Sequence, residues 1–248
     1  MSSNHFPIGL TDHDRLEKEL GGGIPRGSIV LVEGDYGAGK SVLSQRFTYG
    51  FNTEDVVTTL VSTELGVKGF LDQMDSLAYD MVKPLINEEV LFIPAEIDAA
   101  GTLSGGDDER KELLKRMMGA ETMWDADVII IDTFDAILRN DPKFEALVRE
   151  NEERQAALEI ISFFRDLTTK GKTIVLTVDP STVDEEAIGP FQSIADVYLE
   201  LEMVEVGNDV RRNIFVKRFA GMGQQVGDTV GFSVRSGIGI VIESRSVA

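Results

Sequence analysis

The sequence predicts an α/β fold with a mainly parallel central sheet and an antiparallel β extension near its C-terminal end. Strand-like runs alternate with helix-like segments from residue 28 to residue 179, which is the pattern of strand–helix–strand crossovers. The strand-like runs lack alternating polarity, as strands buried on both faces do. After residue 196 the helical segments stop, and closely spaced strand-like runs follow, which is typical of hairpins added to one sheet edge.

The elements follow one another without a linker that would mark a second domain. The parallel part is predicted to contain strands over 28–33, 56–64, 90–96, 127–133 and 173–179, separated by helices over 37–51, 67–78, 108–124 and 144–170. The extension is predicted to contain strands over 197–206, 212–220 and 231–244. Because 248 residues suffice for one full core, residues 1–248 are expected to form a single domain.

The composition excludes several kinds of site and indicates the cytoplasm. The chain has no cysteine, which excludes disulfides and thiolate metal sites and fits a reducing compartment. Its only histidines are His5 and His13, so neither a histidine-based triad nor a histidine zinc site is expected. The N-terminus lacks the regions of a signal peptide, and the most apolar runs are too short to span a bilayer.

The charge balance argues against nucleic acid as a partner. The chain carries 43 acidic and 24 basic residues, a net charge of −19, and such a surface repels phosphate backbones. The same charge also fits a solubilising surface without a binding role. Because net charge is an average, it does not exclude a local basic groove.

One motif carries specific chemistry. The segment GDYGAGKS at residues 34–41 matches the phosphate-loop pattern Gly-x4-Gly-Lys-Ser without a mismatch, and it stands between a strand and a helix. Its glycines let the backbone curl so that successive N–H groups point at phosphate oxygens, and the following helix adds its positive N-terminal end. The residues expected to bind the nucleotide are Gly34, Asp35, Tyr36, Gly37, Ala38, Gly39, Lys40, Ser41 and Val42.

Two residues of this motif and one later carboxylate predict a site for a Mg²⁺-bound nucleotide. Lys40 can reach the β- and γ-phosphates, and the Ser41 hydroxyl can ligate Mg²⁺. Asp132 ends the β-branched run Val128–Ile131, where a carboxylate is needed to hold the metal's water shell. An ordinary strand-terminating Asp is the alternative, but the phosphate loop favours the metal role. Ser41 and Asp132 are therefore the expected metal ligands.

No glutamate follows the metal-binding Asp132, although many nucleotidases of this class place there the residue that polarises the attacking water. Thr133, Phe134 and Asp135 follow instead. Either another residue supplies the base, or hydrolysis is slow.

The run LVSTEL at residues 60–65 offers such a residue. In phosphate-loop folds of the RecA type, the strand after the first crossover lies beside the metal-binding strand, which would let Glu64 orient the attacking water. An alternative is that Ser62, Thr63 and Glu64 cap the helix over 67–78. Ser62 and Thr63 are also candidate phosphoacceptors, although capping accounts for their hydroxyls equally well. The expected catalytic residues are Lys40, Glu64 and Asp132.

The segment LEKELGGGIPRGSIVLVEGDYGAGKS, residues 16–41, resembles the start of the KaiC branch of the RecA superfamily, in which a GGGIP-x-G run precedes the phosphate-loop strand. Within this branch, the chain resembles the FlaH (ArlH) family of archaellum accessory ATPases. This narrower resemblance rests on the single-domain length, the VSTEL and VIIIDT strand ends, and the tail VKRFAG…FSV…GIGIVIES. It covers nearly the whole chain.

The resemblance implies a RecA-like, KaiC-type core that binds ATP and can assemble as a hexameric ring. It further implies a cytoplasmic place at the membrane periphery, in the archaellum motor complex, beside the motor ATPase FlaI and the membrane platform protein FlaJ. Direct membrane insertion is not expected. Matched to the family's motifs, the phosphate loop falls on residues 34–41, the metal carboxylate on Asp132 and the strand-end glutamate on Glu64.

KaiC-type rings also place basic residues of one subunit at the γ-phosphate bound by its neighbour. Lys217 and Arg218, in the predicted strand over 212–220, stand where this pattern would put them. Their spacing differs from the usual Lys-x-Arg, so the resemblance leaves open which of the two would act in trans.

Three functions are compatible with these features. The first, and the expected one, is a nucleotide-dependent assembly and regulatory subunit of the archaellum motor, which hydrolyses ATP slowly or not at all. The second is a recombinase or helicase-type DNA-dependent ATPase. Such an enzyme usually needs basic, glycine-containing loops, whereas the candidate loops here, over 139–154 and 180–190, are largely acidic. The third is a KaiC-like autokinase that acts as a signalling switch.

Overall fold

The strands form close to where the sequence predicts them, except that the run expected as one strand over 231–244 contributes to two antiparallel strands. The computed structural model describes residues 4–95, 117–140, 153–206, 209–221 and 227–243. The strands of the main sheet are β3 (Ile29–Gly34), β4 (Thr58–Ser62), β5 (Val90–Pro94), β6 (Val128–Asp132), β7 (Thr173–Val178), β8 (Val197–Val206), β9 (Asp209–Phe219), β10 (Thr229–Arg235) and β11 (Gly239–Glu243). Two short strands form a separate antiparallel pair, β1 (His5–Phe6) and β2 (Ile24–Pro25).

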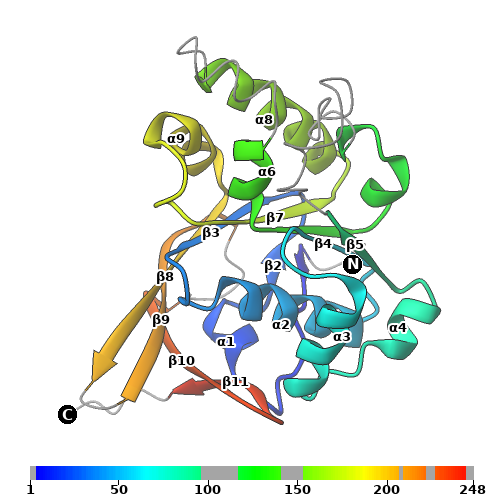
Figure 1. Ribbon diagram of the computed structural model, residues 1–248, viewed down its shortest axis with the longest axis vertical. Coiled ribbons are helices and arrows are strands. Elements are labelled where there is room, and N and C mark those ends of the chain that lie inside the picture. The colour runs from blue at the N-terminus through cyan, green and yellow to red at the C-terminus, as the bar shows by residue number, and fades with distance from the viewer. Residues whose placement is uncertain (1–3, 96–116, 141–152, 207–208, 222–226, 244–248) are drawn as a thin grey trace, which may run out of the picture.

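The main sheet has nine strands in the order β11-β10-β9-β8-β3-β7-β6-β4-β5 (Figure 1). The six strands β8, β3, β7, β6, β4 and β5 run parallel to one another. By contrast, β9, β10 and β11 form an antiparallel extension that starts from β8. The predicted fold class, a mainly parallel sheet with a C-terminal antiparallel extension, is therefore confirmed.

Helices cover both faces of this sheet. They are α1 (Leu16–Glu19), α2 (Lys40–Thr53), α3 (Val67–Ser76), α4 (Val82–Ile86), α6 (Phe134–Asn140), α8 (Glu153–Thr169) and α9 (Glu185–Ile194), with a 3-10 helix η1 (Glu121–Trp124). Figure 1 shows α1 to α4 on one side and α6, α8 and α9 on the other. Among the described residues, no helix combines the length and apolar character that crossing a membrane would require.

Parts of two predicted helices lie outside the described residues. The helix expected over 108–124 is described only from residue 117, and there it is interrupted at residues 119–120, before the 3-10 helix η1. The helix expected over 144–170 is described only from residue 153. The segment over 139–154, which bears on the DNA-dependent alternative, is likewise mostly outside them.

One segment that we expected to be a loop, over 180–190, forms a helix from Glu185 onward. Gly189 and Pro190 are loop-forming residues in general, and they account for the wrong expectation. The packing of the segment overrides them, because its apolar side chains pack in the same cluster as those of α6 and α8. These buried side chains are Ala187, Ile188 and Phe191.

The strand β3 shows why polarity does not alternate along these strands. Its residues are all buried, but successive side chains enter different clusters. Val30 and Val32 pack with side chains of α2 and α3, whereas Ile29 and Leu31 pack with those of α6, α8 and α9. The predicted burial of this strand on both faces is confirmed.

The strand order gathers several strand ends at one edge of the sheet. The connection from β3 through α2 to β4 passes over β7 and β6, so the carboxyl ends of these four parallel strands lie side by side. In the register, Ser62 at the end of β4 is paired with Asp132 at the end of β6. The LVSTEL strand therefore lies beside the predicted metal-binding strand.

A buried ion pair ties the N-terminal segment to α2. The Arg46 guanidinium donates from Nε to Asp14 Oδ2 at 2.5 Å and from Nη2 to Asp14 Oδ1 at 2.9 Å. It also donates to the carbonyls of Ile8 at 2.6 Å and Gly9 at 2.8 Å. Because α2 begins at the phosphate loop, this pair fixes the helix that carries the loop.

Replacing Arg46 with Met should destabilise the fold strongly. It leaves the Asp14 carboxylate buried without a counter-ion, which typically costs about 3–5 kcal/mol of unfolding free energy. Lys68→Met is the control, because Lys68 pairs with Asp72 on an exposed surface, where ion pairs contribute little. Urea denaturation measures both variants, and equal midpoints would show that the buried pair carries no special stability.

Candidate functional site

The phosphate loop joins β3 to α2, and two of its glycines adopt conformations that other residues rarely take. Gly37 has φ of 82° and Gly39 has φ of 102°, both in the left-handed region. The Ala38 N–H donates to the Asp35 carbonyl at 3.1 Å and closes the turn at the loop tip. Gly39 is the N-cap of α2 and has no side chain that could cap the helix. The first N–H groups of the helix can therefore bind an anion.

The Lys40 ammonium contacts the loop itself and one further carboxylate. Its Nζ donates to the carbonyls of Gly34 at 2.5 Å and Asp35 at 3.1 Å, and it lies 3.8 Å from Asp179 Oδ2. A bound phosphate would compete with these oxygens for the ammonium. The predicted contact of Lys40 with the β- and γ-phosphates stays a prediction.

The structure brings the two predicted metal ligands together. The Asp132 carboxylate accepts from the hydroxyls of Thr177 at 2.7 Å and Ser44 at 3.2 Å, and an interaction with the Ser41 hydroxyl also lowers its pKa. Burial raises the pKa of Asp132, while these hydrogen bonds lower it. Carboxylate and hydroxyl oxygens are the hard ligands that Mg²⁺ takes, so the residues present fit the predicted ion.

Glu64 lies close enough to this group to interact with it electrostatically. Burial raises the pKa of Glu64, the Asp132 carboxylate raises it further, and the Lys40 ammonium lowers it. The Thr133 hydroxyl also hydrogen-bonds to the Glu64 carboxylate. A carboxylate with a raised pKa accepts protons more readily near neutral pH, which is the property that a water-activating residue needs.

The hydroxyls of Ser62 and Thr63 do not cap α3, so the capping alternative is wrong for that helix. The N-cap of α3 is Gly66, which makes no side-chain cap bond. The Ser62 hydroxyl instead accepts from the N–H groups of Glu64 at 3.3 Å and Leu65 at 3.2 Å, and so closes the turn before the helix. Within the described residues the buried Thr63 hydroxyl has no hydrogen-bond partner. The phosphoacceptor roles stay predictions.

The residues after β6 are held in place by the fold. Asp135 in α6 is fully buried, and its carboxylate accepts from the Asp179 N–H at 3.1 Å and the Thr182 hydroxyl at 2.7 Å. Thr133 has φ of 60°, which is strained for a β-branched residue, and its N–H donates to the Thr177 hydroxyl at 2.8 Å. Asp135 is therefore engaged in structural bonds, and it is not placed as the missing base.

Sequence reasoning missed two site residues, Thr177 and Asp179, at the end of β7. They belong to the site because β7 lies between β3 and β6. One oxygen of the Asp179 carboxylate lies near Lys40, and the other accepts from the Ser181 N–H at 3.0 Å and hydroxyl at 2.6 Å. The available signal was the polar end of the predicted strand over 173–179, which is the kind of signal that identified LVSTEL.

Lys217 and Arg218, predicted to act in trans, make contacts within their own chain. The Lys217 ammonium pairs with Glu200 at 2.6 Å. The Arg218 Nη1 donates to carbonyls at the C-terminal end of α9, of which that of Ala195 is nearest at 2.7 Å. A trans role would require these side chains to exchange partners, and it stays a prediction.

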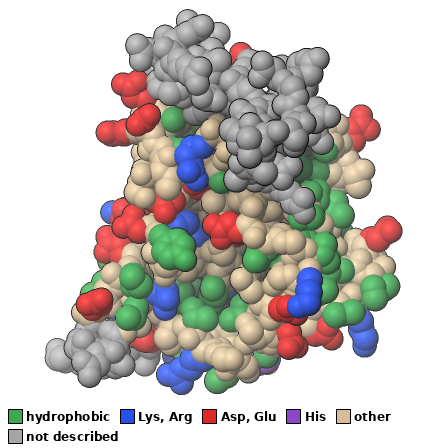
Figure 2. Space-filling view, viewed as in Figure 1, with side chains coloured by type: hydrophobic (Ala, Val, Ile, Leu, Met, Phe, Trp, Pro, Cys, Tyr) green, Lys and Arg blue, Asp and Glu red, His purple; other side chains and the backbone are tan. Residues whose placement is uncertain are grey.

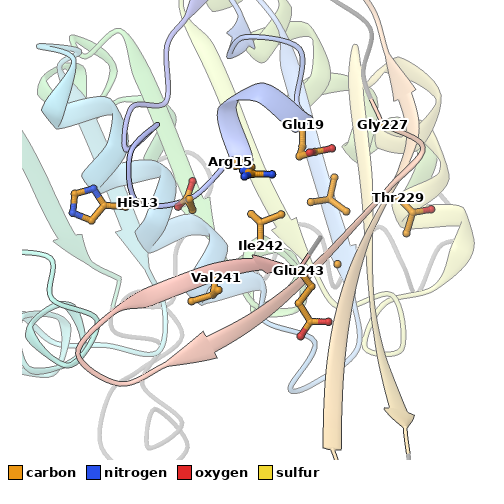
Figure 3. Close-up of a pocket in the computed structure, with 11 residues that line it drawn as sticks. His13, Arg15, Glu19, Gly227, Thr229, Val241, Ile242 and Glu243 are labelled. Atoms are coloured by element: carbon orange, nitrogen blue, oxygen red, sulfur yellow. The ribbon is translucent and has the colours of Figure 1, made fainter. Parts of the chain in front are cut away.

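A separate cavity lies between α1 and the last strands of the extension (Figure 3). Its volume is about 490 Å³. Arg15 and Glu19 line it from the α1 side, and Thr229 and Glu243 line it from β10 and β11. It mixes basic and acidic groups, and none of the described residues that line it belongs to the phosphate loop. The phosphate loop, rather than this cavity, is therefore the candidate site.

The phosphate loop, the carboxylate of Asp132 and the strand order that brings them together define a phosphate-loop NTPase fold of the RecA type. The family model "ATPase: KaiC" matches residues 9–246. The archaeal flagellar ATP-binding protein FlaH of Methanocaldococcus jannaschii is 32% identical over 236 residues, which cover 95% of this chain and 94% of that protein. The chain therefore belongs to the KaiC-type ATPases and, among them, to the FlaH family.

Solved structures agree with this assignment. The crystal structure of the flagellar accessory protein FlaH from Methanocaldococcus jannaschii has a TM-score of 0.84 at 30% identity, over 97% of this chain and 100% of that chain. A KaiC-like protein from Pyrococcus horikoshii has a TM-score of 0.72 at 18% identity, over 97% of this chain and 99% of that chain, and shows the fold alone. The RecA-like, KaiC-type core predicted from the resemblance is confirmed.

If Glu64 orients the attacking water, Glu64→Gln should slow ATP hydrolysis by roughly 10²–10⁴-fold. ATP affinity should change little, since the carboxylate acts mainly in the transition state. The wild-type rate should also fall as pH falls through the raised pKa of Glu64, because a protonated carboxyl group cannot accept the water's proton. Hydrolysis measured against pH tests both points, with the exposed Glu88→Gln as control. Full activity of the Glu64→Gln variant would contradict the assignment.

Proposed function

We propose that this chain is the ATP-binding regulatory and assembly subunit of an archaellum motor. The names of its relatives support an ATP-binding role in the archaeal flagellum. The single observation that carries the proposal is the hydrogen bond from Ser44 in α2 to the Asp132 carboxylate at 3.2 Å, because it joins the helix of the phosphate loop to β6 and so brings Ser41 and Asp132 together. A Mg²⁺ ion held by these two residues would neutralise phosphate charge, while the loop N–H groups and Lys40 would hold the phosphates.

The proposed ATP turnover is slow or absent. Thr133 occupies the position next to Asp132 at which many related nucleotidases carry a glutamate, and the buried Asp135 carboxylate is already engaged. Glu64, just after the end of the neighbouring strand β4, is then the carboxylate proposed to orient the attacking water. A cation supplied by a neighbouring subunit would be in place only after a ring has closed. ATP then serves mainly as a ligand that favours one state of assembly.

The proposed assembly is a ring, hexameric by family resemblance, that docks with the motor ATPase FlaI and the membrane platform protein FlaJ. Lys217 or Arg218 on β9 would reach the γ-phosphate bound by the next subunit, so that ATP links two subunits. A ligand that binds the assembled form more tightly shifts the population toward it. The proposed location is the cytoplasm, at the membrane periphery, through these partners.

A DNA-dependent ATPase is the alternative that the charge distribution disfavours. Figure 2 shows Asp and Glu side chains spread over the visible face, interspersed with Lys and Arg side chains. The segment over 180–190 carries Asp184, Glu185 and Glu186 at the start of α9. Carboxylates in a candidate DNA-binding segment would repel the phosphate backbone of DNA.

Lys40→Ala should weaken binding of Mg²⁺–ATP by roughly 10- to 100-fold, since it removes charge-assisted contacts to the phosphates. Titration calorimetry measures the affinity. Lys170→Ala is the matched control, because Lys170 pairs with Asp166 on an exposed part of α8 and its loop. An unchanged affinity of the Lys40→Ala variant would remove the proposed function.

Light scattering should show a larger assembly with ATP than with ADP or without nucleotide. The double variant Lys217→Ala/Arg218→Ala should lose this dependence, because it removes the proposed link between subunits. Higher salt should favour the assembly, since it screens repulsion between chains of net charge −19. Equal mass in all nucleotide states would sink the idea of ATP-gated assembly. Normal assembly of the double variant would assign the trans contact to other residues.

A further inference from the structure

Strand β8 packs against the start of the phosphate loop, and the C-terminal extension packs against its end. At the start of the loop, a Cβ atom on Gly34 would lie 2.8 Å from the carbonyl oxygen of Leu201 in β8. At its end, a Cβ atom on Gly39 would lie 3.1 Å from Phe232 Cζ and 3.2 Å from Arg212 Cδ. A side chain at Gly34 would therefore come too close to β8, and one at Gly39 would come too close to the extension.

Arg212 adds a directed contact at the tip of the loop. Its Nε donates to the carbonyl of Gly37 at 3.1 Å. Its position is fixed by the sheet, since Arg212 in β9 is paired with the fully buried Phe232 in β10. A side chain anchored on a paired strand thus holds the most conformationally free part of the loop.

The neighbouring arginines of β9 have other partners. Arg211 lies 3.6 Å from Glu243, and Arg218 binds the end of α9. Within the described residues, Arg212 has no carboxylate at ion-pair distance, and its hydrogen bond goes to the loop. Among the described residues, its charge therefore faces the phosphate loop and no carboxylate at ion-pair distance.

Two physical effects follow from this contact. A glycine loop loses conformational freedom when it orders around phosphate, and a contact that orders it beforehand reduces the loss on binding. A guanidinium is a charged donor, and a charged donor makes a stronger hydrogen bond than a neutral one. Its charge also attracts phosphate independently of Lys40.

We propose that Arg212 is a positioning residue of the phosphate loop, which holds the Gly37 carbonyl and thereby raises the affinity for nucleotide phosphates. Because it acts on the loop as a whole, it raises the affinities for ATP and ADP alike. This inference rests on the proposed function, nucleotide binding at the phosphate loop, and adds to that site a residue of the C-terminal extension.

Titration calorimetry of the full chain with Mg²⁺–ATP and Mg²⁺–ADP tests the proposal. Arg212→Gln should weaken both nucleotides by about tenfold, the size of one charge-assisted hydrogen bond. Arg211→Gln is the matched control, because it removes the same charge one residue away, and it should leave both affinities within about twofold. Arg212→Lys keeps the charge without the planar donor group and should restore only part of the affinity.

Thermal unfolding without nucleotide separates positioning from general stability, and the midpoints of the Arg211 and Arg212 variants should be similar. Should Arg212→Gln fail to fold, Arg212→Lys carries the same test in a folded chain. Equal losses of affinity in Arg211→Gln and Arg212→Gln would overturn the proposal, since only net charge would then matter. Wild-type affinity in both Arg212 variants would overturn it as well.

The failure of this proposal can be told apart from failure of the proposed function. If the wild type does not bind ATP, or binds it equally well after Lys40→Ala, the proposed function fails and the inference about Arg212 fails with it. If the wild type binds ATP through Lys40 and Arg212→Gln binds equally well, the inference about Arg212 alone is overturned.

Discussion

The site depends on the complete burial of β3, which is covered on both faces and paired on both edges, with β7 on one side and β8 on the other. A strand held in this way cannot shift its register without exposing apolar side chains on both faces. The phosphate loop therefore starts at a fixed position, Gly34. It ends at the start of α2, and Arg46 holds that helix in place. The other groups of the site lie at the ends of strands placed relative to β3.

In the proposed function, a cation as well as phosphates would bind at this edge of the sheet. The Lys40 ammonium lies among the carboxylates of Asp132, Asp179 and Glu64, and the pKa of two of these carboxyls, Asp132 and Glu64, is raised mainly by burial. A triphosphate entering this group brings more negative charge, so a divalent cation is needed to offset the repulsion. If Mg²⁺ binds at Asp132 as proposed, its binding and the protonation of Glu64 would influence each other.

The extension belongs to the site, although the phosphate loop lies far from it in the sequence. Three basic residues of β9 bind three different places: Arg212 the loop tip, Lys217 the Glu200 carboxylate on β8, and Arg218 the end of α9. In the proposed function, the residues that would link subunits therefore share a strand with a residue that holds the loop. A change of either contact would act on the same strand, and this is the proposed route by which ATP favours assembly.

The sequence by itself determined the features whose causes are local. The glycines of GDYGAGKS permit the curled loop, the β-branched run before Asp132 predicts a strand buried on both faces, and LVSTEL indicates a polar strand end. Only the tertiary structure decided which strand ends meet. The insertion of β7 between β3 and β6 brought in Asp179, the packing of apolar side chains made a helix of a segment with Gly189 and Pro190, and strand pairing in the extension placed Arg212 on Gly37. The reason is that contacts between segments distant in sequence are selected by burial and strand pairing over the whole molecule, which local propensities do not specify.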